Sequence, residues 1–300
     1  YGPDRNRSYN IYTQNDVGLK IFKHNIIFSS SHYGWHIYTE SGELKNMELD
    51  GNITFYSGNL HGLTQSELII GSTTKRPENI TIKNSVFFSK HYRNFSIGNS
   101  SPENTSVKFT DNYVVGENDS YAYFSNNWDS FESIGNTFIA DITGFSVWYD
   151  INLNNAAINR NKYYSLNSRA IHNMSFSEWQ NTQGFDLDGE EHLSMPVQNK
   201  VFVFPNAYES KRAHISVFNW ENIINQDVDC SAFLNNGDTY YVYDVQNMQT
   251  VVATGTYNGI YIQLPLNLTA VQQPYGNLGS NAIHTPTLFN CFIISNKLLL

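Results

Sequence analysis

One short segment of the sequence carries two side chains that could do acid–base chemistry. His36 and Tyr38 alternate with Trp35 and Ile37. Side chains alternate between the two faces of a strand, so a strand that buries Trp35 and Ile37 points His36 and Tyr38 outward together. A β-elimination beside a carboxylate needs a base, an acid for the leaving oxygen and a cation that neutralises the carboxylate. We therefore take this segment as the centre of a candidate catalytic site.

The roles in such a reaction can be assigned to four residues. His36 or His32 is the candidate base, and Tyr38 is the candidate acid. Arg93 is the candidate cation for the carboxylate. The alternative is a set of surface-exposed side chains, or side chains that are hydrogen-bonded within the fold, without a catalytic role.

A second pattern adds His91 to the candidate site. His32 and His91 each follow a repeated Asn by seven residues. If they lie two strand spacings apart, about 10 Å separates them, which suits the two sides of a bound sugar. The alternative is that turns are polar in any case. The residues at this position form the series His32, Asn59, His91, Asp119, Thr143 and Ser168.

A hydrolase would use carboxylates instead. Two carboxyl groups about 5 Å or about 7–9 Å apart would be needed to break a glycosidic bond. Aromatic rings nearby could stack on the sugar faces, and Trp128, Trp148 and Tyr149 are the candidate substrate-binding residues. No tight pair of acidic residues occurs in this region, which favours the elimination over the hydrolysis. The acidic candidates are Asp129, Asp141 and Asp150.

A metal site is predicted only in outline. Asp186, Asp188 and Glu190 lie close together in the sequence, and carboxylate oxygens are the ligands that Ca²⁺ prefers. The spacing matches no EF-hand loop, and a solvated acidic loop is the alternative. No His and Cys residues have zinc-ligand spacing, so no other metal or cofactor is predicted.

The element that must position the candidate site is a repeat. Six segments share an Asn followed by an apolar or β-forming run, at intervals of 24 to 32 residues. Such a period is typical of a stacked repeat, because one unit cannot bury its apolar face alone. The short β runs within each unit favour a coil with several sheet faces. The repeated residues are Asn25, Asn52, Asn84, Asn112, Asn136 and Asn161.

The Asn residues have a physical role in this interpretation. Asn tolerates a left-handed turn and bonds to the backbone through its amide. Stacked about 4.8 Å apart, such amides form a ladder along the coils.

The repeat predicts a domain at residues 1–175, and two further regions follow it. Residues 176–198 form an elbow, where Ser177 and Gln180 have the spacing of a helix capping box. Residues 199–296 contain longer strand-like runs separated by turn signals, which is typical of an antiparallel β-sandwich. The predicted fold is therefore all-β: a right-handed parallel β-helix followed by a β-sandwich.

Composition and charge limit the partners. The chain is 40% hydrophobic and 15% charged, with a net charge of −9. It has no basic stripe, so no nucleic acid is expected. No apolar stretch reaches about 18 residues, so no membrane insertion is expected. Cys230 and Cys291 could form a disulfide or remain two buried thiols.

The chain resembles the right-handed parallel β-helix proteins of the pectate-lyase-like superfamily, in particular secreted bacterial members with a β-sandwich behind the solenoid. Segments 9–15, 33–38, 178–186 and 204–209 carry the resemblance. It implies a polysaccharide or glycan lying along the solenoid and an extracellular or cell-surface location. The superfamily contains lyases, hydrolases and adhesins, so the fold does not decide the activity.

Two hypotheses about function follow. The first is a polysaccharide lyase that acts on uronate-containing polymers. The second is a non-catalytic surface, fibre or glycan-binding protein. In the second, the repeat begins without a preceding cap, so an open N-terminal coil would allow end-to-end assembly.

Overall fold

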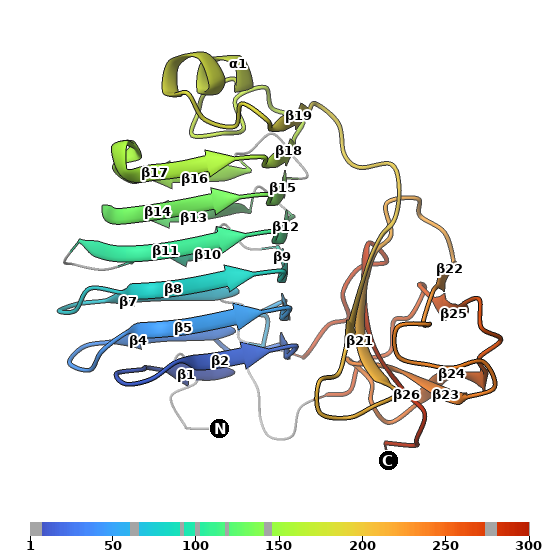
Figure 1. Cartoon of the computed structure of the whole chain (residues 1–300). Coiled ribbons are helices and arrows are strands. Elements are labelled where there is room, and N and C mark those ends of the chain that lie inside the picture. Colours follow the sequence, from blue (N-terminus) through green and yellow to red (C-terminus); the bar gives the residue numbers. More distant parts are fainter. Residues whose placement is uncertain are drawn as a thin grey trace. The chain divides into compact units, whose positions relative to one another are not determined.

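The chain folds into two compact units, Tyr1–Met195 and Pro196–Leu300. A computed structural model describes residues 8–60, 66–90, 93–99, 103–117, 120–140, 146–273 and 281–299. The first unit is a parallel β-solenoid and the second contains an antiparallel sheet (Figure 1). The predicted all-β fold is confirmed.

Three parallel sheets run the length of the solenoid, and each coil contributes one strand to each of them. The first sheet contains β1 (Ile11–Thr13), β4 (Trp35–Thr39), β7 (Leu68–Ser72), β10 (Arg93–Ile97), β13 (Tyr121–Ser125) and β16 (Val147–Asp150). The second contains β2 (Lys20–Lys23), β5 (Lys45–Asp50), β8 (Glu78–Lys83), β11 (Asn104–Thr110), β14 (Trp128–Ile134) and β17 (Ala156–Asn159). The third contains β3 (Ile26–Phe28), β6 (Ile53–Phe55), β9 (Val86–Ser89), β12 (Tyr113–Gly116), β15 (Thr137–Ala140), β18 (Lys162–Tyr164) and β19 (Glu190–His192).

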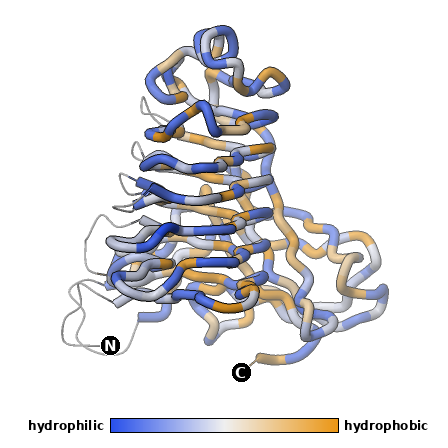
Figure 2. Tube along the Cα trace, turned by 60° about the vertical axis from the view of Figure 1, so that its left-hand side comes forward, coloured by the Kyte–Doolittle hydropathy of each residue, from blue (hydrophilic) through white to orange (hydrophobic). Residues whose placement is uncertain are grey.

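The core of the solenoid is built from the inward-pointing side chains, which alternate with less buried ones in strands such as β4, whereas β6, β7, β9 and β12 are buried throughout. Hydrophobic and hydrophilic stretches accordingly succeed one another along the coils in Figure 2. Inside, aromatic rings stack from coil to coil: Phe124 lies 5.3 Å from Tyr149, and Tyr149 lies 5.5 Å from Trp179, each pair nearly parallel. Offset stacking of this kind adds to the stabilisation from burial.

An amide ladder joins the coils where the chain turns into the third sheet. The backbone N–H and side-chain Nδ2 of Asn112 both donate to Oδ1 of Asn136, at 2.9 and 3.1 Å. Asn136 donates to Asn161 in the same way, at 2.9 and 3.0 Å. Each amide thus satisfies a backbone donor of the preceding coil, which would otherwise be buried without a partner. The residues one position earlier have a left-handed φ between 51° and 70°: His24, Gly51, Asn84, Asp111, Gly135 and Arg160.

The prediction was wrong at one position of the ladder, where Asn84 was expected. The ladder position of the third coil is Ser85, whose N–H donates to Oδ1 of Asn112 at 2.9 Å and whose Oγ accepts from Asn52 N at 3.2 Å. Asn84 takes the left-handed position before it and donates to Asp50 at 2.9 Å. A serine hydroxyl is shorter than an amide but can still accept from the backbone, so it fits this coil.

Asp186 ends the ladder and the solenoid core. Its Oδ1 accepts from N and Nδ2 of Asn161 at 3.0 and 2.9 Å. Its Oδ2 accepts from Tyr163 Oη at 2.7 Å and from Trp179 Nε1 at 2.9 Å. The side chain has this room because the next coil has Gly189, where a Cβ would lie 2.8 Å from Cβ of Asp186. A carboxylate, which only accepts, therefore replaces the amide at the last rung.

The elbow after the last full coil is helical, but its cap differs from the prediction. The capping box is formed by Ser175 and Glu178, not by Ser177 and Gln180. The short helix α1 (Phe176–Glu178) runs into the π-helix η3 (Trp179–Gln183), which places Trp179 on the core. A single 3-10 turn, η2 (Leu153–Asn155), precedes β17.

The second unit is sandwich-like. Its five-stranded antiparallel sheet has the order β20 (Lys200–Pro205), β21 (Arg212–Phe218), β26 (Phe289–Ser295), β23 (Thr239–Asp244) and β24 (Val251–Thr256). A second sheet pairs β22 (Asn225–Val228) with β25 (Ile262–Pro265). Both sheets contribute to one core, for example through Ile215, Phe292 and Ile262. Cys230 and Cys291 are buried free thiols.

Candidate functional site

The outer face of the first sheet carries the residues that the sequence singles out. In β4, Trp35 and Ile37 are fully buried, and His36 and Tyr38, which alternate with them, are partly exposed. This is the arrangement that the alternation predicts. The register places Tyr12 of β1 beside His36, so the outward positions of successive coils form columns.

His36 lies at the centre of a group of rings that we call the histidine cluster. The ring of His36 is 4.2 Å from that of Tyr9 and 5.1 Å from that of Tyr12. It stacks nearly parallel on Tyr38 at 5.1 Å. His32 packs edge-on against Tyr33 at 4.3 Å and Tyr9 at 5.1 Å. The histidine cluster consists of Tyr9, Tyr12, His32, Tyr33, His36 and Tyr38.

Burial keeps the imidazole of His36 neutral. Burial, reinforced by the nearby His32, lowers the pKa of His36 to about 4. At neutral pH the ring is therefore uncharged and carries one nitrogen lone pair that can accept a proton. Its Nδ1 is buried and has no hydrogen-bond partner in the described part of the chain.

Arg93 belongs to a second group on the same face, which we call the arginine cluster: Arg93, Tyr121, Tyr123 and Asp150. The guanidinium of Arg93 lies over the ring of Tyr123, 4.2 Å from its centre, and Nε is 3.5 Å from Oη of Tyr121. Tyr123 in turn donates to Asp150 Oδ2 at 2.9 Å. Burial and the hydrogen bond to Asp150 raise the pKa of Tyr123 to about 12.

Arg93 also connects the two clusters. β10 and β4 are separated by β7, so their backbones lie about 9.6 Å apart. Burial raises the pKa of Tyr33 in the histidine cluster, and the positive charge of Arg93 opposes this increase. The field of the guanidinium therefore reaches the histidine cluster. The structure brings His32, His36 and Tyr38 together, and the charge of Arg93 acts on Tyr33 of the same cluster.

Only one of the three predicted sugar-stacking residues lies on this face. Trp148 is the register neighbour of Tyr123, and its ring is 4.9 Å from that of His172. Trp128 and Tyr149 are buried, with 1% and 0% of their surface exposed. Trp128 Nε1 donates to Ser125 O at 3.2 Å, and Tyr149 Oη bonds to Ser133 at 3.0 Å. Both rings belong to the core, where a sugar cannot stack on them.

The predicted polar column is described only in part. His91, Asp119 and Thr143 lie outside the described residues. Asn59 is buried, and its Nδ2 is 3.4 Å from Oγ of Ser29.

Asp129 and Asp150, the two hydrolase candidates within the described residues, do not face one another. Asp129 lies on β14 in the second sheet, where it forms an ion pair with Arg76. Asp150 ends β16 in the first sheet and accepts from Tyr123. Asp141 lies outside the described residues.

The acidic residues after the elbow each have a partner of their own. Asp186 ends the amide ladder, and Asp188 accepts from Asn159 at 3.0 Å. Glu190 pairs with Lys162 at 2.8 Å and with His192 at 3.1 Å. Among the described residues, no group of three or more His, Cys, Asp and Glu side chains is placed to hold a metal ion. The calcium site at Asp186, Asp188 and Glu190 stays a prediction.

The sequence reasoning missed most of the aromatic residues of the face. Tyr12, His36, Tyr123 and Trp148 occupy equivalent outward positions, as the register of neighbouring strands shows. The sequence signal was a ring in the outward position of most coils, which requires the strands to be aligned first. Tyr9 and Tyr33 precede their strands, so no strand pattern identifies them.

Comparisons with known proteins leave the family open. No protein-family model matches the chain, and neither the curated proteins nor the solved structures include a significant match. Within the described residues, no helix is long and apolar enough to cross a membrane.

Proposed function

We propose that the protein binds a uronate-containing polysaccharide along the outer face of the first sheet and cleaves it as a lyase. The observation that carries this proposal is the position of Arg93. Its guanidinium stacks on the partly exposed ring of Tyr123 and acts electrostatically on Tyr33 of the histidine cluster. Rings stack on sugar faces, and a guanidinium binds a carboxylate through paired hydrogen bonds.

The histidine cluster supplies the acid–base groups of the reaction. His36, neutral at pH 7, takes the proton from the carbon beside the carboxylate. The electron pair forms a carbon–carbon double bond as the glycosidic oxygen leaves, and Tyr38 gives that oxygen its proton. Arg93 stabilises the negative charge that develops on the carboxylate. The low pKa of His36 makes it a weak base, so this chemistry relies on the acidity that Arg93 confers on the substrate.

The proposal extends to family and location. A parallel solenoid followed by a sandwich-like unit is the architecture expected of the secreted pectate-lyase-like proteins that the sequence resembles. Their polymeric substrates lie outside the cell. We therefore propose an extracellular or cell-surface location.

The test is the ultraviolet absorbance of the conjugated double bond that elimination creates. The purified protein is incubated with polygalacturonate, alginate and glycosaminoglycans, and reducing ends are measured in parallel. We expect absorbance to rise with one of these polymers and to stop rising in His36→Gln and in Tyr38→Phe. Lys108→Gln, on the second sheet, is the matched control and should keep the wild-type rate. Binding without any product would reject the lyase and leave a glycan-binding face.

A second candidate function is a non-catalytic fibre or surface protein. Three apolar residues of the first described coil are exposed: Val17 at 85%, Leu19 at 60% and Ile21 at 52%. Among the described residues, β1, β2 and β3 each pair on one side only, and open strand edges accept further strands. Light scattering tests this alternative. Concentration-dependent association that is lost in Ile21→Lys would support it, and a monomer at all concentrations would reject it.

A further inference from the structure

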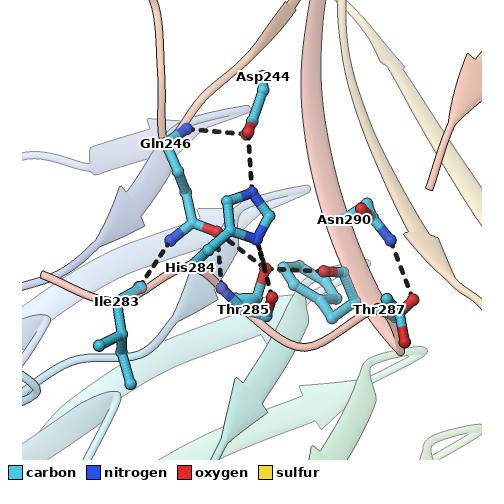
Figure 3. Close-up of polar contacts among 8 residues, drawn as sticks. Asp244, Gln246, Ile283, His284, Thr285, Thr287 and Asn290 are labelled. Atoms are coloured by element: carbon cyan, nitrogen blue, oxygen red, sulfur yellow. Dashed lines mark hydrogen bonds and ion pairs between the residues drawn. The ribbon is translucent and has the colours of Figure 1, made fainter. Parts of the chain in front are cut away.

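A buried polar network lies in the second unit. It joins the end of β23 to segment 281–288, which leads directly into β26 (Figure 3). Of the residues drawn in Figure 3, Asp244 and His284 are the ionisable ones. Their side chains are 4% and 7% exposed, respectively. A buried charged pair at the junction of two strands and a connecting segment calls for a physical explanation.

The ring of His284 is held from both sides. Its Nε2 is 2.8 Å from Asp244 Oδ2, and its Nδ1 is 2.8 Å from the backbone oxygen of Thr285. A backbone oxygen only accepts, and so does an ionised carboxylate. Both contacts are hydrogen bonds only if both ring nitrogens carry a proton, so the pair contains one proton more than a neutral imidazole beside a carboxylate.

The side-chain amide of Gln246, just after β23, forms hydrogen bonds with the same segment. Its Oε1 accepts from the N–H and the hydroxyl of Thr285 at 3.0 and 2.8 Å. Its Nε2 donates to Ile283 O at 3.2 Å, and its backbone N–H donates to Asp244 Oδ1 at 3.0 Å. Asp244 therefore orients Gln246 as well as His284, and a change at the ion pair reaches the contacts of Ile283, His284 and Thr285.

The groups that face the pair come from three elements. Asp244 ends β23, His284 belongs to the segment, and the thiol of Cys291 belongs to β26. Burial and the charge of Asp244 both raise the pKa of Cys291, so the thiol stays neutral beside the carboxylate. Among the described residues, no other charged group is paired with Asp244 or His284.

We infer that the Asp244–His284 pair is a proton-dependent latch that holds segment 281–288 against β23 and β26 and releases it as the pH rises. When the imidazolium loses its proton, one of its two acceptors loses its hydrogen bond while still buried. An unsatisfied buried acceptor is unfavourable, and the loss of the positive charge also leaves Asp244 buried without its partner. Local opening of the segment restores water to both groups.

The direction of the response follows from the pKa of His284. Burial lowers it, but the hydrogen bonds to Asp244 and Thr285 outweigh burial, so the pKa lies above the ordinary value of 6.5. A group with a raised pKa stabilises the fold fully below its unfolded value, and this contribution is lost as the pH rises through the folded value. The latch is therefore closed below about pH 6.5, and it opens as the pH rises through the raised pKa of His284.

Hydrogen exchange of the intact protein tests the latch. Exchange of the amides of segment 281–288 is measured by mass spectrometry from about pH 5 to about pH 9, corrected for the intrinsic rate at each pH. We expect protection of this segment to fall about fivefold or more across the titration of His284, because the lost proton leaves a buried acceptor unsatisfied. In His284→Gln the protection should be low and independent of pH. His192→Gln, in the first unit, is the matched control and should behave as the wild type.

A second measurement keeps the inference testable if His284→Gln does not fold. The ring signals of His284 in the unmodified protein report its titration by nuclear magnetic resonance. We expect a single transition above pH 6.5 that coincides with the loss of protection. A transition below that value, or protection that stays constant through the transition, would overturn the latch. So would a fall in protection that persists in His284→Gln.

Discussion

The outer faces of the first and second sheets differ although they belong to the same coils. On the second sheet, opposite charges pair across neighbouring coils: Lys23 with Asp50 at 3.1 Å, Lys83 with Glu48 at 3.1 Å and Lys108 with Glu132 at 3.3 Å. The first sheet instead carries rings, in the histidine cluster and beside Arg93.

The difference suggests that the two faces have different roles: the charged face keeps the protein in solution, and the face with rings is suited to binding a ligand. Exposed ion pairs contribute at most about 1 kcal/mol each and keep a sheet face in water without binding anything in particular. Partly exposed rings do not help to keep a sheet face in water, but they can stack on ligands. Because both faces enclose one core, the contrast cannot be a consequence of packing inside the solenoid. We take the first sheet as the functional face for this reason.

The largest effect on stability is expected at Asp186, because it supports the solenoid core that carries both faces. In Asp186→Asn the amide oxygen can still accept from Asn161, but the amide nitrogen faces the indole N–H of Trp179, which cannot turn away. Two donors that face each other in a buried position should lower the free energy of unfolding by about 2–3 kcal/mol.

Denaturant unfolding of Asp186→Asn measures this loss. Asp188→Asn is the matched control, because Asp188 is exposed and should change stability by less than about 0.5 kcal/mol. Equal stability of the two variants would show that the last rung does not support the solenoid. The ligand affinity of the folded fraction should be unchanged in both.

A smaller effect is expected from removing one cation on each face. Arg93→Gln should weaken binding of an acidic polysaccharide about tenfold or more, because a hydrogen bond to a charged group contributes about 1.5–3 kcal/mol. Lys108→Gln on the second sheet should leave the affinity unchanged. Isothermal titration calorimetry with polygalacturonate measures both. Equal losses in the two variants would mean that the polymer responds to net charge, and the first sheet would lose its special status.

The sequence predicted the scaffold better than the face. Asn at equivalent positions marks the ladder because its amide has both a donor and an acceptor. The rungs at Ser85 and Asp186 were missed, because a hydroxyl or a carboxylate can also accept from the backbone. The alternation in β4 predicted the outward position of His36 and Tyr38. Tyr9 and Tyr33 could not be found, because they meet His36 through turns whose geometry has no sequence period.

The sequence analysis also failed to distinguish core rings from surface rings, and the reason is physical. Trp128 and Trp148 both lie in strands of the solenoid. Only the position relative to neighbouring coils decides that the first is buried and the second lies on the outer face. An aromatic side chain suits either position, since a solenoid core and a sugar-binding face both favour rings.

The first sheet and the second unit should also respond to pH with opposite signs. Burial lowers the pKa of His36 to about 4 from an ordinary value of 6.5. The unfolded chain therefore binds a proton in this window that the folded chain does not, so stability falls as the pH drops from about 6.5 to about 4. The response of His284 is the opposite, because its pKa is raised.

His36→Phe isolates this acid response, because phenylalanine keeps the ring contacts with Tyr9 and Tyr38 and cannot take up a proton. Denaturant midpoints at about pH 4.5 and about pH 7 should differ less in His36→Phe than in the wild type. His192→Gln should keep the wild-type difference, since His192 lies outside the histidine cluster. An unchanged difference in His36→Phe would show that His36 is protonated without disturbing its neighbours. The rings around it would then be loosely packed, as an open binding surface requires, rather than a closed part of the fold.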